Sequence, residues 1–127
     1  MTTDSGADAT IKGLRILVVE DEMAIAMLIE DMLLDLGAEV VGPIGRLAQA
    51  QAIAADDPLD LAVVDVNVAG EPVYPLVETL ARRGIRFAFS TGYGAGGIEA
   101  PWRDRPVLQK PFSQAQLEAV LKMVVSG

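Results

Sequence analysis

Residues 61–67 read LAVVDVN, and the interpretation of the whole chain depends on this stretch. Apolar residues, among them the adjacent β-branched Val63 and Val64, lead directly into Asp65. This pattern predicts a buried strand with a carboxylate at its end. Such an aspartate often only caps a turn or the following helix. The role of Asp65 therefore depends on which other polar residues reach the same place.

Composition restricts the chemistry that the chain can support. Its 127 residues suffice for one domain with one core, and 51% of them are apolar. The formal net charge of -8 argues against nucleic acid as a direct partner and is compatible with binding a cation. Cysteine and histidine are both absent, which excludes disulfides, thiolate or imidazole metal ligands and histidine-based triads. Any chemistry must therefore use carboxylates, hydroxyls, lysine and the backbone.

The amino terminus carries no recognisable targeting signal. Residues 1–10, MTTDSGADAT, have neither the basic region nor the apolar segment of a signal peptide. No later stretch approaches the roughly 18 consecutive apolar residues that a membrane span needs. We therefore expect a soluble, cytoplasmic protein with no membrane partner. We expect residues 1–12 to form a flexible tail and residues 13–127 to form a single domain, with no output domain.

Hydrophobic periodicity predicts strands and helices that alternate along the chain. Strands are predicted at residues 14–19, 39–42, 61–65, 85–89 and 106–109. Helices are predicted at residues 23–36 and 47–55, from Pro75 to just before Gly84, and from Ser113 onward. Ser113 forms a capping box with Gln116. Residues 92–105 hold several glycines and Pro101, so we expect a mostly irregular segment with at most a short helical piece.

The first predicted helix has an apolar stripe at helical spacing, followed by Gly37 as a C-terminal cap. The stripe consists of Ile25, Leu28, Ile29, Met32 and Leu36. In the last predicted helix the corresponding stripe is Leu117, Val120, Leu121 and Val124. Both stripes predict helices that pack on a sheet.

Strands and helices in this order predict an α/β fold with a doubly wound parallel sheet, because right-handed crossovers place a helix between successive strands. The carboxyl ends of all the strands then share one edge, where ligands of such sheets bind. The polar residues predicted to meet there are Glu20, Asp21, Asp65, Asn67, Thr91 and Lys110. We interpret this edge as the candidate site.

The residue types at this edge restrict its chemistry. Two carboxylates about 4 Å apart repel by roughly 4 kcal/mol at an effective dielectric of about 20, so Asp21 and Asp65 need a cation. Magnesium suits such oxygen ligands. Asp65 could give one oxygen to the metal and use the other as a nucleophile. Lys110 and the Thr91 hydroxyl could both contact a phosphoryl group, so the set predicts an acyl phosphate on Asp65.

In this order and at these separations, the residues resemble the receiver domain of bacterial two-component response regulators. The resemblance covers the chain from residue 14 onward and rests on LVVEDE, VVDVNVAGE, FSTGYG and LQKPF. It implies a flavodoxin-like, five-stranded parallel sheet of order 2-1-3-4-5, with a fourth helix that is short or irregular in this chain. FSTGYG is also similar to the FxTGYG variant of some single-domain receivers.

The resemblance assigns a role to each site residue. It implies that Asp65 is the phosphoacceptor and that Mg²⁺ is held by Glu20, Asp21, Asp65 and the backbone carbonyl of Asn67. It makes Thr91 the switch hydroxyl and Lys110 the phosphate-contacting lysine. Backbone amides near Asn67 and at Gly92 would complete the phosphoryl cradle, and Asn67 and Tyr93 would tune dephosphorylation. Alternation along the strand does not decide between Ser90 and Thr91, and the resemblance favours Thr91.

Two positions depart from the family pattern. Val107 stands where the family usually has an aromatic residue that moves with the switch threonine, so we expect that toggle to be missing. Ala69 stands where a proline is common, four residues after the phosphoacceptor. GYGAGG lacks the lysine and hydroxyl of a P-loop, and we interpret it as a flexible loop. Together with the glycines of residues 92–105, these departures predict an unusual output face.

The leading hypothesis is a stand-alone phosphoacceptor response regulator, a monomer or weak dimer. It would receive its phosphoryl group from a histidine kinase or histidine phosphotransfer protein and act through a downstream protein or as a phosphate sink. It would catalyse only its own phosphotransfer and dephosphorylation. One alternative is an interaction module that keeps the fold without phosphorylation. The other is a magnesium-dependent aspartyl-phosphate phosphohydrolase, although Asn67 stands where such enzymes have an acid.

Overall fold

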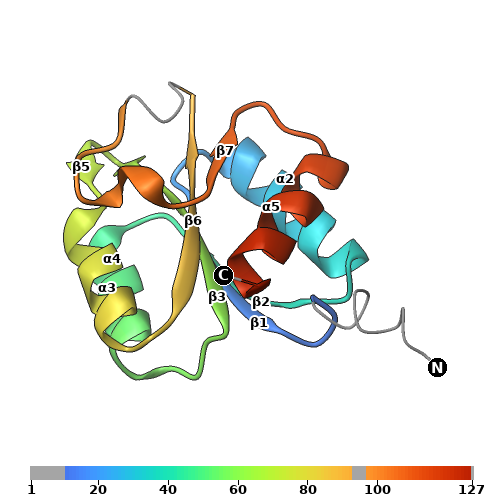
Figure 1. Cartoon of the computed structure of the whole chain (residues 1–127), viewed down its shortest axis with the longest axis horizontal. Helices are drawn as coiled ribbons and strands as arrows, with labels where there is room; N and C mark the ends of the chain where they lie inside the picture. Colours follow the sequence, from blue (N-terminus) through green and yellow to red (C-terminus); the bar gives the residue numbers. More distant parts are fainter. Residues whose placement is uncertain (1–10, 93–96, 127) are drawn as a thin grey trace.

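The centre of the fold is a five-stranded parallel sheet, seen in a computed structural model that describes residues 11–92 and 97–126. In sheet order the strands are β2 (Glu39–Ile44), β1 (Arg15–Val19), β3 (Leu61–Asp65), β6 (Arg86–Thr91) and β7 (Val107–Gln109) (Figure 1). All four neighbouring pairs are parallel. Counted along the chain, this is the order 2-1-3-4-5, so the predicted flavodoxin-like sheet is confirmed.

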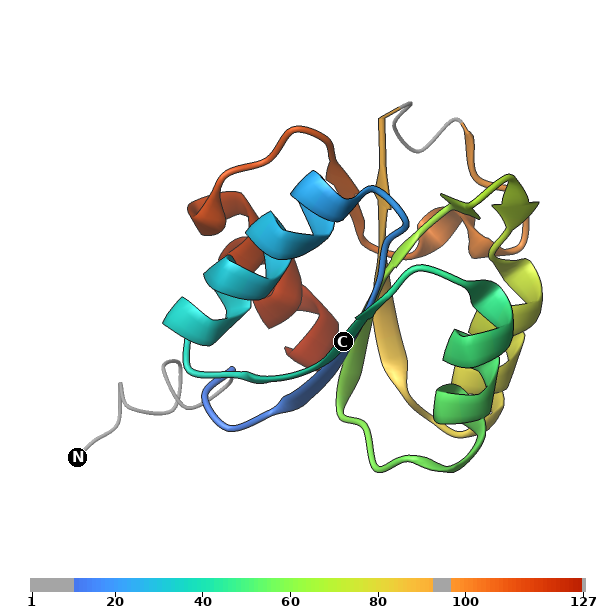
Figure 2. The same ribbon diagram turned by 180° about the vertical axis from the view of Figure 1, so that it is seen from behind.

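Helices cover both faces of this sheet. Helices α2 (Met23–Asp35) and α5 (Gln114–Ser126) lie on one face, and α3 (Leu47–Asp56) and α4 (Tyr74–Arg82) lie on the other (Figures 1 and 2). Strand residues alternate between the two resulting core clusters: Ile16 and Val18 belong to one, and Leu17 and Val19 to the other. Within the described part of the chain, no helix is both long and apolar enough to cross a membrane.

The central position of β3 in the sheet explains its uninterrupted apolar run. Leu61, Ala62, Val63 and Val64 are all buried, because helices cover both faces of the strand. Only Asp65, at the carboxyl end, is partly exposed. The strand therefore delivers one carboxylate to the edge of the sheet, as predicted.

Two strands run further than predicted. β6 was expected to end at residue 89, but it includes Ser90 and Thr91, whose partners in β7 are Leu108 and Gln109. β2 was expected to end at Gly42 but continues through Pro43 to Ile44. A register shift between β1 and β2 accommodates Gly42, whose φ is 105°, and the proline. Polar residues and a Gly-Pro pair usually end a strand, which explains both errors.

Helix starts and faces differ from the predictions in detail. The capping box is confirmed: Ser113 N donates to Gln116 Oε1 at 2.8 Å, and Gln116 N donates to Ser113 Oγ at 3.1 Å. α4 begins at Tyr74, so Pro75 is its second residue and not its first. Leu28 was placed in the apolar stripe of α2, but it is 53% exposed, because Ala26, Ile29 and Leu33 form the buried face.

A short hairpin, β4 (Asn67–Val68) and β5 (Glu71–Pro72), follows β3 and was not predicted. Its two-residue turn is Ala69-Gly70, with φ of 51° and 85°. Positive φ at both positions is typical of a type I′ turn, which matches the twist of hairpin strands. Proline is locked near a φ of about −65° and cannot occupy Ala69. This geometry accounts for the missing proline.

Two segments were expected to lack regular structure, the amino-terminal tail and residues 92–105. The structure corrects the first prediction and agrees with the second. Ile11 was assigned to the flexible tail, but it is 2% exposed and belongs to the core cluster of α2 and α5, so this assignment is wrong at Ile11. Residues 98–105 contain one short helical piece, the 3-10 helix η2 (Trp102–Asp104), in agreement with the prediction. Residues 1–10 and 93–96 lie outside the described residues.

Candidate functional site

The carboxyl ends of the strands open into a cleft of about 600 Å³. Residues from β3, β4 and β6 and from the segments that follow β1, β3, β6 and β7 line it: Asp21, Glu22, Asp65, Val66, Asn67, Thr91, Gly92, Gly97 and Lys110. Six of the predicted site residues are therefore together. Glu20 is buried and joins them through its ion pair with Lys110. Tyr93 lies outside the described residues.

The strands determine where each functional side chain lies. Asp65 is the last residue of β3 and is paired in register with Ser90 of β6. Lys110 follows β7, and its backbone N donates to the Thr91 carbonyl oxygen at 2.8 Å. This bond brings the lysine beside the end of β6 and next to the end of β3. The switch from apolar to polar residues at each strand end thus becomes a spatial cluster.

Lys110 forms an ion pair with each of two carboxylates. Its Nζ lies 2.8 Å from Glu20 Oε1 and 2.9 Å from Asp65 Oδ2. The side chains of Lys110 and Asp65 are each 13% exposed, and that of Glu20 is fully buried. Backbone amides bind the remaining carboxylate oxygens: Glu22 N donates to Glu20 Oε2 and Asn67 N to Asp65 Oδ1. These contacts offset the repulsion between the two acids.

Burial and charge perturb the titration of this cluster. Burial raises the pKa of Glu20 above its ordinary value, more than its hydrogen bonds with Lys110 and Glu22 lower it. For Lys110, burial alone would lower the pKa, but its hydrogen bonds with Glu20 and Asp65 outweigh burial and raise the pKa. The lysine therefore stays charged at neutral pH and provides a fixed positive charge beside Asp65.

The acidic residues at this edge are a suitable donor set for a hard cation. Carboxylate oxygens of Glu20, Asp21 and Asp65 lie within 4.8 Å of one another. Oxygen ligands of this kind, next to an open cleft that leaves room for water, suit magnesium. Asp21 is exposed, so its carboxylate is accessible to a cation from solvent. The residues present therefore fit the predicted metal.

The structure separates the two candidate hydroxyls. Thr91 lines the cleft, whereas Ser90 does not. Along β6, side chains alternate in direction, so Thr91 shares a face with Phe87 and Phe89, and Ser90 shares the opposite face with Ala88. Ser90 is 1% exposed, and among the described residues its hydroxyl has no hydrogen-bond partner. The hydroxyl at the cleft is therefore that of Thr91.

Sequence reasoning did not assign three residues that line the cleft: Glu22, Val66 and Gly97. Glu22 is the third acid of the run EDE, and only the first two had been given a role. Gly97 was placed in the irregular segment, and no local pattern indicates that its backbone returns to the cleft. Contacts of this kind depend on the tertiary path of residues 97–105.

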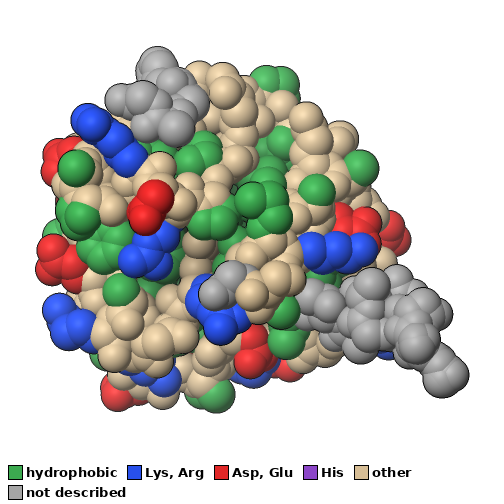
Figure 3. Space-filling model, viewed as in Figure 1, with side chains coloured by type: hydrophobic (Ala, Val, Ile, Leu, Met, Phe, Trp, Pro, Cys, Tyr) green, Lys and Arg blue, Asp and Glu red, His purple; other side chains and the backbone are tan. Residues whose placement is uncertain are grey.

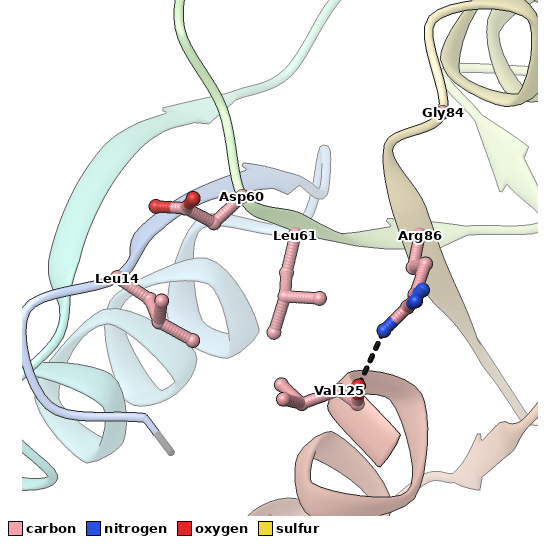
Figure 4. A pocket seen from close by; sticks show the side chains of 6 residues that line it. All are labelled: Leu14, Asp60, Leu61, Gly84, Arg86 and Val125. Carbon is pink, nitrogen blue, oxygen red and sulfur yellow. Dashed lines mark hydrogen bonds between the residues drawn. The ribbon is translucent and has the colours of Figure 1, made fainter. Parts of the chain in front are cut away.

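Two other hollows of the described structure lack such a cluster of acids. Figure 3 shows hydrophobic side chains exposed beside basic ones where β6, β7 and α5 meet; the hollow of about 320 Å³ in this region is lined by Arg86, Phe87, Arg105, Pro106, Met123 and Val124. Figure 4 shows a cavity of about 220 Å³ at the amino ends of the strands. Its charged groups are already paired, since Asp60 accepts from Arg15 N and Arg86 donates to the Val125 carbonyl.

The fold resembles solved structures of known proteins. The chain is 40% identical to SdrG from Sphingomonas melonis Fr1, whose solution structure matches with a TM-score of 0.81. The match covers 91% of this chain and 98% of SdrG. The chain belongs to the receiver domains of response regulators. No protein-family model and no curated protein matches this receiver.

Further solved structures resemble the receiver. The BeF3-activated conformation of SdrG, from Pseudomonas melonis Fr1, is 42% identical, with 88% of this chain and 98% of that chain covered and a TM-score of 0.74. The receiver domain of the sensor histidine kinase PA1611 from Pseudomonas aeruginosa PAO1 is 23% identical, with 91% and 99% covered and a TM-score of 0.75. That structure has a magnesium ion coordinated in its active site cleft.

Proposed function

We propose that this receiver accepts a phosphoryl group on Asp65 and signals through the resulting change in its surface. The observation that carries the proposal is the Asp65 carboxylate at the end of β3, held 2.9 Å from Lys110 Nζ and open to the cleft. A carboxylate that is only 13% exposed and bound to a fixed cation is oriented for attack. The existence of a BeF3-activated conformation of the related SdrG supports this assignment.

The reaction is a phosphoryl transfer between a donor and one carboxylate oxygen. An Asp65 oxygen forms a bond to phosphorus while the bond between phosphorus and the donor atom breaks, and the leaving group keeps the electron pair. Lys110 is charged throughout and attracts the phosphoryl oxygens as its contact with Asp65 loosens. The natural donor in this proposal is a histidine kinase or a histidine phosphotransfer protein.

Magnesium is the cofactor of the proposed transfer. Glu20, Asp21, Asp65 and the backbone carbonyl of Asn67 would hold it, and the acids among them are those whose oxygens cluster within 4.8 Å. When bound, the ion would neutralise charge that builds up on the phosphoryl oxygens. Backbone amides at Gly92 and near Asn67 would complete the cradle, and both residues line the cleft. Asn67 and Tyr93 would tune hydrolysis of the aspartyl phosphate.

Thr91 would report the phosphoryl group to the rest of the fold. Moving a two-state equilibrium from 1:99 to 99:1 requires about 5.5 kcal/mol of differential stabilisation. One charge-assisted hydrogen bond from Thr91 contributes roughly 1.5 to 3 kcal/mol, so Lys110 and the metal must supply the rest. Since Val107 offers no aromatic toggle, the change would be passed on by other residues. The receiver would then act on a downstream protein or drain phosphate from another regulator.

Incubation with acetyl phosphate and magnesium tests the proposal. The wild-type protein should gain a single phosphoryl mass, and Asp65→Asn should gain none. Asp56→Asn, which changes an exposed acid at the end of α3, is the matched control and should be labelled like the wild type. Absence of an adduct on the wild type, or an adduct on Asp65→Asn, would contradict the proposal and favour an interaction module that works without phosphorylation.

A further inference from the structure

Residues 97–105 begin at the cleft with Gly97, and Glu99 and Trp102 are two of the residues that attach this segment to the rest of the receiver. Glu99 N donates a hydrogen bond to the Tyr74 hydroxyl, with a distance of 2.9 Å. The Trp102 ring packs against Phe87, with ring centroids 5.9 Å apart. Ile98, directly before Glu99, is 1% exposed and belongs to the core cluster of α3 and α4, so it is a further attachment. The segment has little regular structure, yet these contacts fix its path.

The first attachment lies close to the cleft. Gly97 lines the cleft and is only two residues before Glu99. Because it has no side chain, Gly97 presents backbone to the cleft, and the placement of that backbone depends on how the segment is held. Tyr74 itself begins α4, directly after Val73, whose N donates to the carbonyl of Val66 at 3.0 Å. The segment that follows Asp65, as far as Tyr74, therefore also holds the backbone at Gly97. We call this part of the cleft lining the Gly97 wall.

We propose that the Tyr74 hydroxyl is a positioning group of the phosphoryl site, which holds the Gly97 wall in place through its hydrogen bond with Glu99 N. The inference rests on the proposed phosphorylation of Asp65 and adds a residue that lies outside the four sequence motifs. Tyr74 does not touch the reacting atoms, so it acts through residues 97–99. A phosphoryl group on Asp65 is held best when this wall is fixed, because preorganised groups lose no freedom on binding.

The surrounding rings allow the hydroxyl to be tested alone. Tyr74 packs edge-on against Phe89 with ring centroids 6.5 Å apart, and Phe89 packs against Phe87 at 5.4 Å. Tyr74→Phe keeps this ring packing and removes only the hydroxyl. Phe89 pairs in register with Val107, so the aromatic rings near the usual toggle position come from β6, α4 and residues 97–105.

The test measures binding of beryllofluoride in the presence of magnesium, by calorimetry on the full chain. Tyr74→Phe should bind it about fivefold more weakly than the wild type, the factor that corresponds to one hydrogen bond of about 1 kcal/mol. The matched control is Thr79→Val, which removes another hydroxyl from α4. Thr79 Oγ1 accepts from Gln51 Nε2 and donates to the Pro75 carbonyl, and none of these three residues lines the cleft. This variant should lose stability but bind beryllofluoride like the wild type.

The affinities of the two variants for beryllofluoride decide whether Tyr74 is a positioning group. Wild-type affinity in Tyr74→Phe would overturn the inference, and so would equal weakening in Thr79→Val, because general loosening of α4 would then suffice. A second measurement uses the wild type alone: the Glu99 amide should exchange hydrogen more slowly when beryllofluoride is bound, and unchanged exchange would overturn the inference. If the wild type neither binds beryllofluoride nor takes a phosphoryl group from acetyl phosphate, the proposed function fails as well.

Discussion

Lys110 Nζ lies 2.9 Å from Asp65 Oδ2 and, on its other side, 2.8 Å from Glu20 Oε1. One ammonium group thus forms ion pairs with both the proposed acceptor and a fully buried carboxylate. Removing one partner of a buried ion pair leaves an uncompensated charge, which is costly. The lysine therefore contributes to the fold as well as to the proposed chemistry, and the two contributions can be measured separately.

The first prediction concerns alkaline pH. The pKa of Lys110 is raised above its ordinary value of 10.5, so the stability it contributes is present below pH 10.5 and is lost as the pH rises through the raised pKa. In urea unfolding, the wild type should therefore lose stability above about pH 10.5 more steeply than Lys110→Met. All other residues are the same in the two proteins, so their contributions cancel in the comparison. Parallel pH profiles would contradict the prediction.

The second prediction concerns magnesium. An ion that binds only the folded state stabilises it by about 2.7 kcal/mol at a concentration 100 times its Kd. Asp21→Asn should remove most of the stabilisation that magnesium gives the wild type, yet it should fold normally without the metal because Asp21 is exposed. Asp31→Asn changes an exposed acid of α2 and should respond like the wild type. Thermal unfolding with and without magnesium measures both, and a full magnesium response in Asp21→Asn would remove this residue from the metal site.

The third prediction concerns Ala69, the position where the family often has proline. Its φ of 51° is costly for a residue with a Cβ and impossible for proline. Ala69→Pro should therefore reduce the free energy of unfolding by more than about 1 kcal/mol, and Ala69→Gly should be at least as stable as the wild type. Urea unfolding measures both. A stable Ala69→Pro protein would show that the hairpin turn is not the reason for the missing proline.

The sequence predicts the features of this receiver that local patterns encode. At the carboxyl ends of β1, β3 and β7, apolar residues give way to polar ones, and parallel strands bring those ends together, so Asp65 and Lys110 could be predicted to meet. The hairpin was missed because its strands have two residues each, too short for alternation, and because Ala69-Gly70 is a weak turn signal. The bond from Glu99 to Tyr74 joins residues 25 apart without any periodic pattern, so only the tertiary fold reveals it.

Sequence patterns also do not determine which hydroxyl at the end of β6 reaches the cleft. Alternation places Ser90 and Thr91 on opposite faces, but the sequence does not say which face opens to the cleft. The direction of each side chain is fixed only if β6 continues through both residues. The polar composition of Ser-Thr-Gly does not indicate that it does. Once the strand is extended, Thr91 faces the cleft and Ser90 faces the core cluster of α2 and α5.

The last prediction separates these two hydroxyls. Ser90→Ala removes a buried hydroxyl that has no hydrogen-bond partner among the described residues, so it should leave stability unchanged or raise it by up to about 1 kcal/mol. Its phosphorylation by acetyl phosphate should match that of the wild type. Thr91→Ala should still accept a phosphoryl group on Asp65, because the nucleophile and Lys110 remain. It should lose most of the accompanying change in the fluorescence of Trp102, the one tryptophan of the chain. A full fluorescence response in Thr91→Ala, or its loss in Ser90→Ala, would reverse the assignment of the switch.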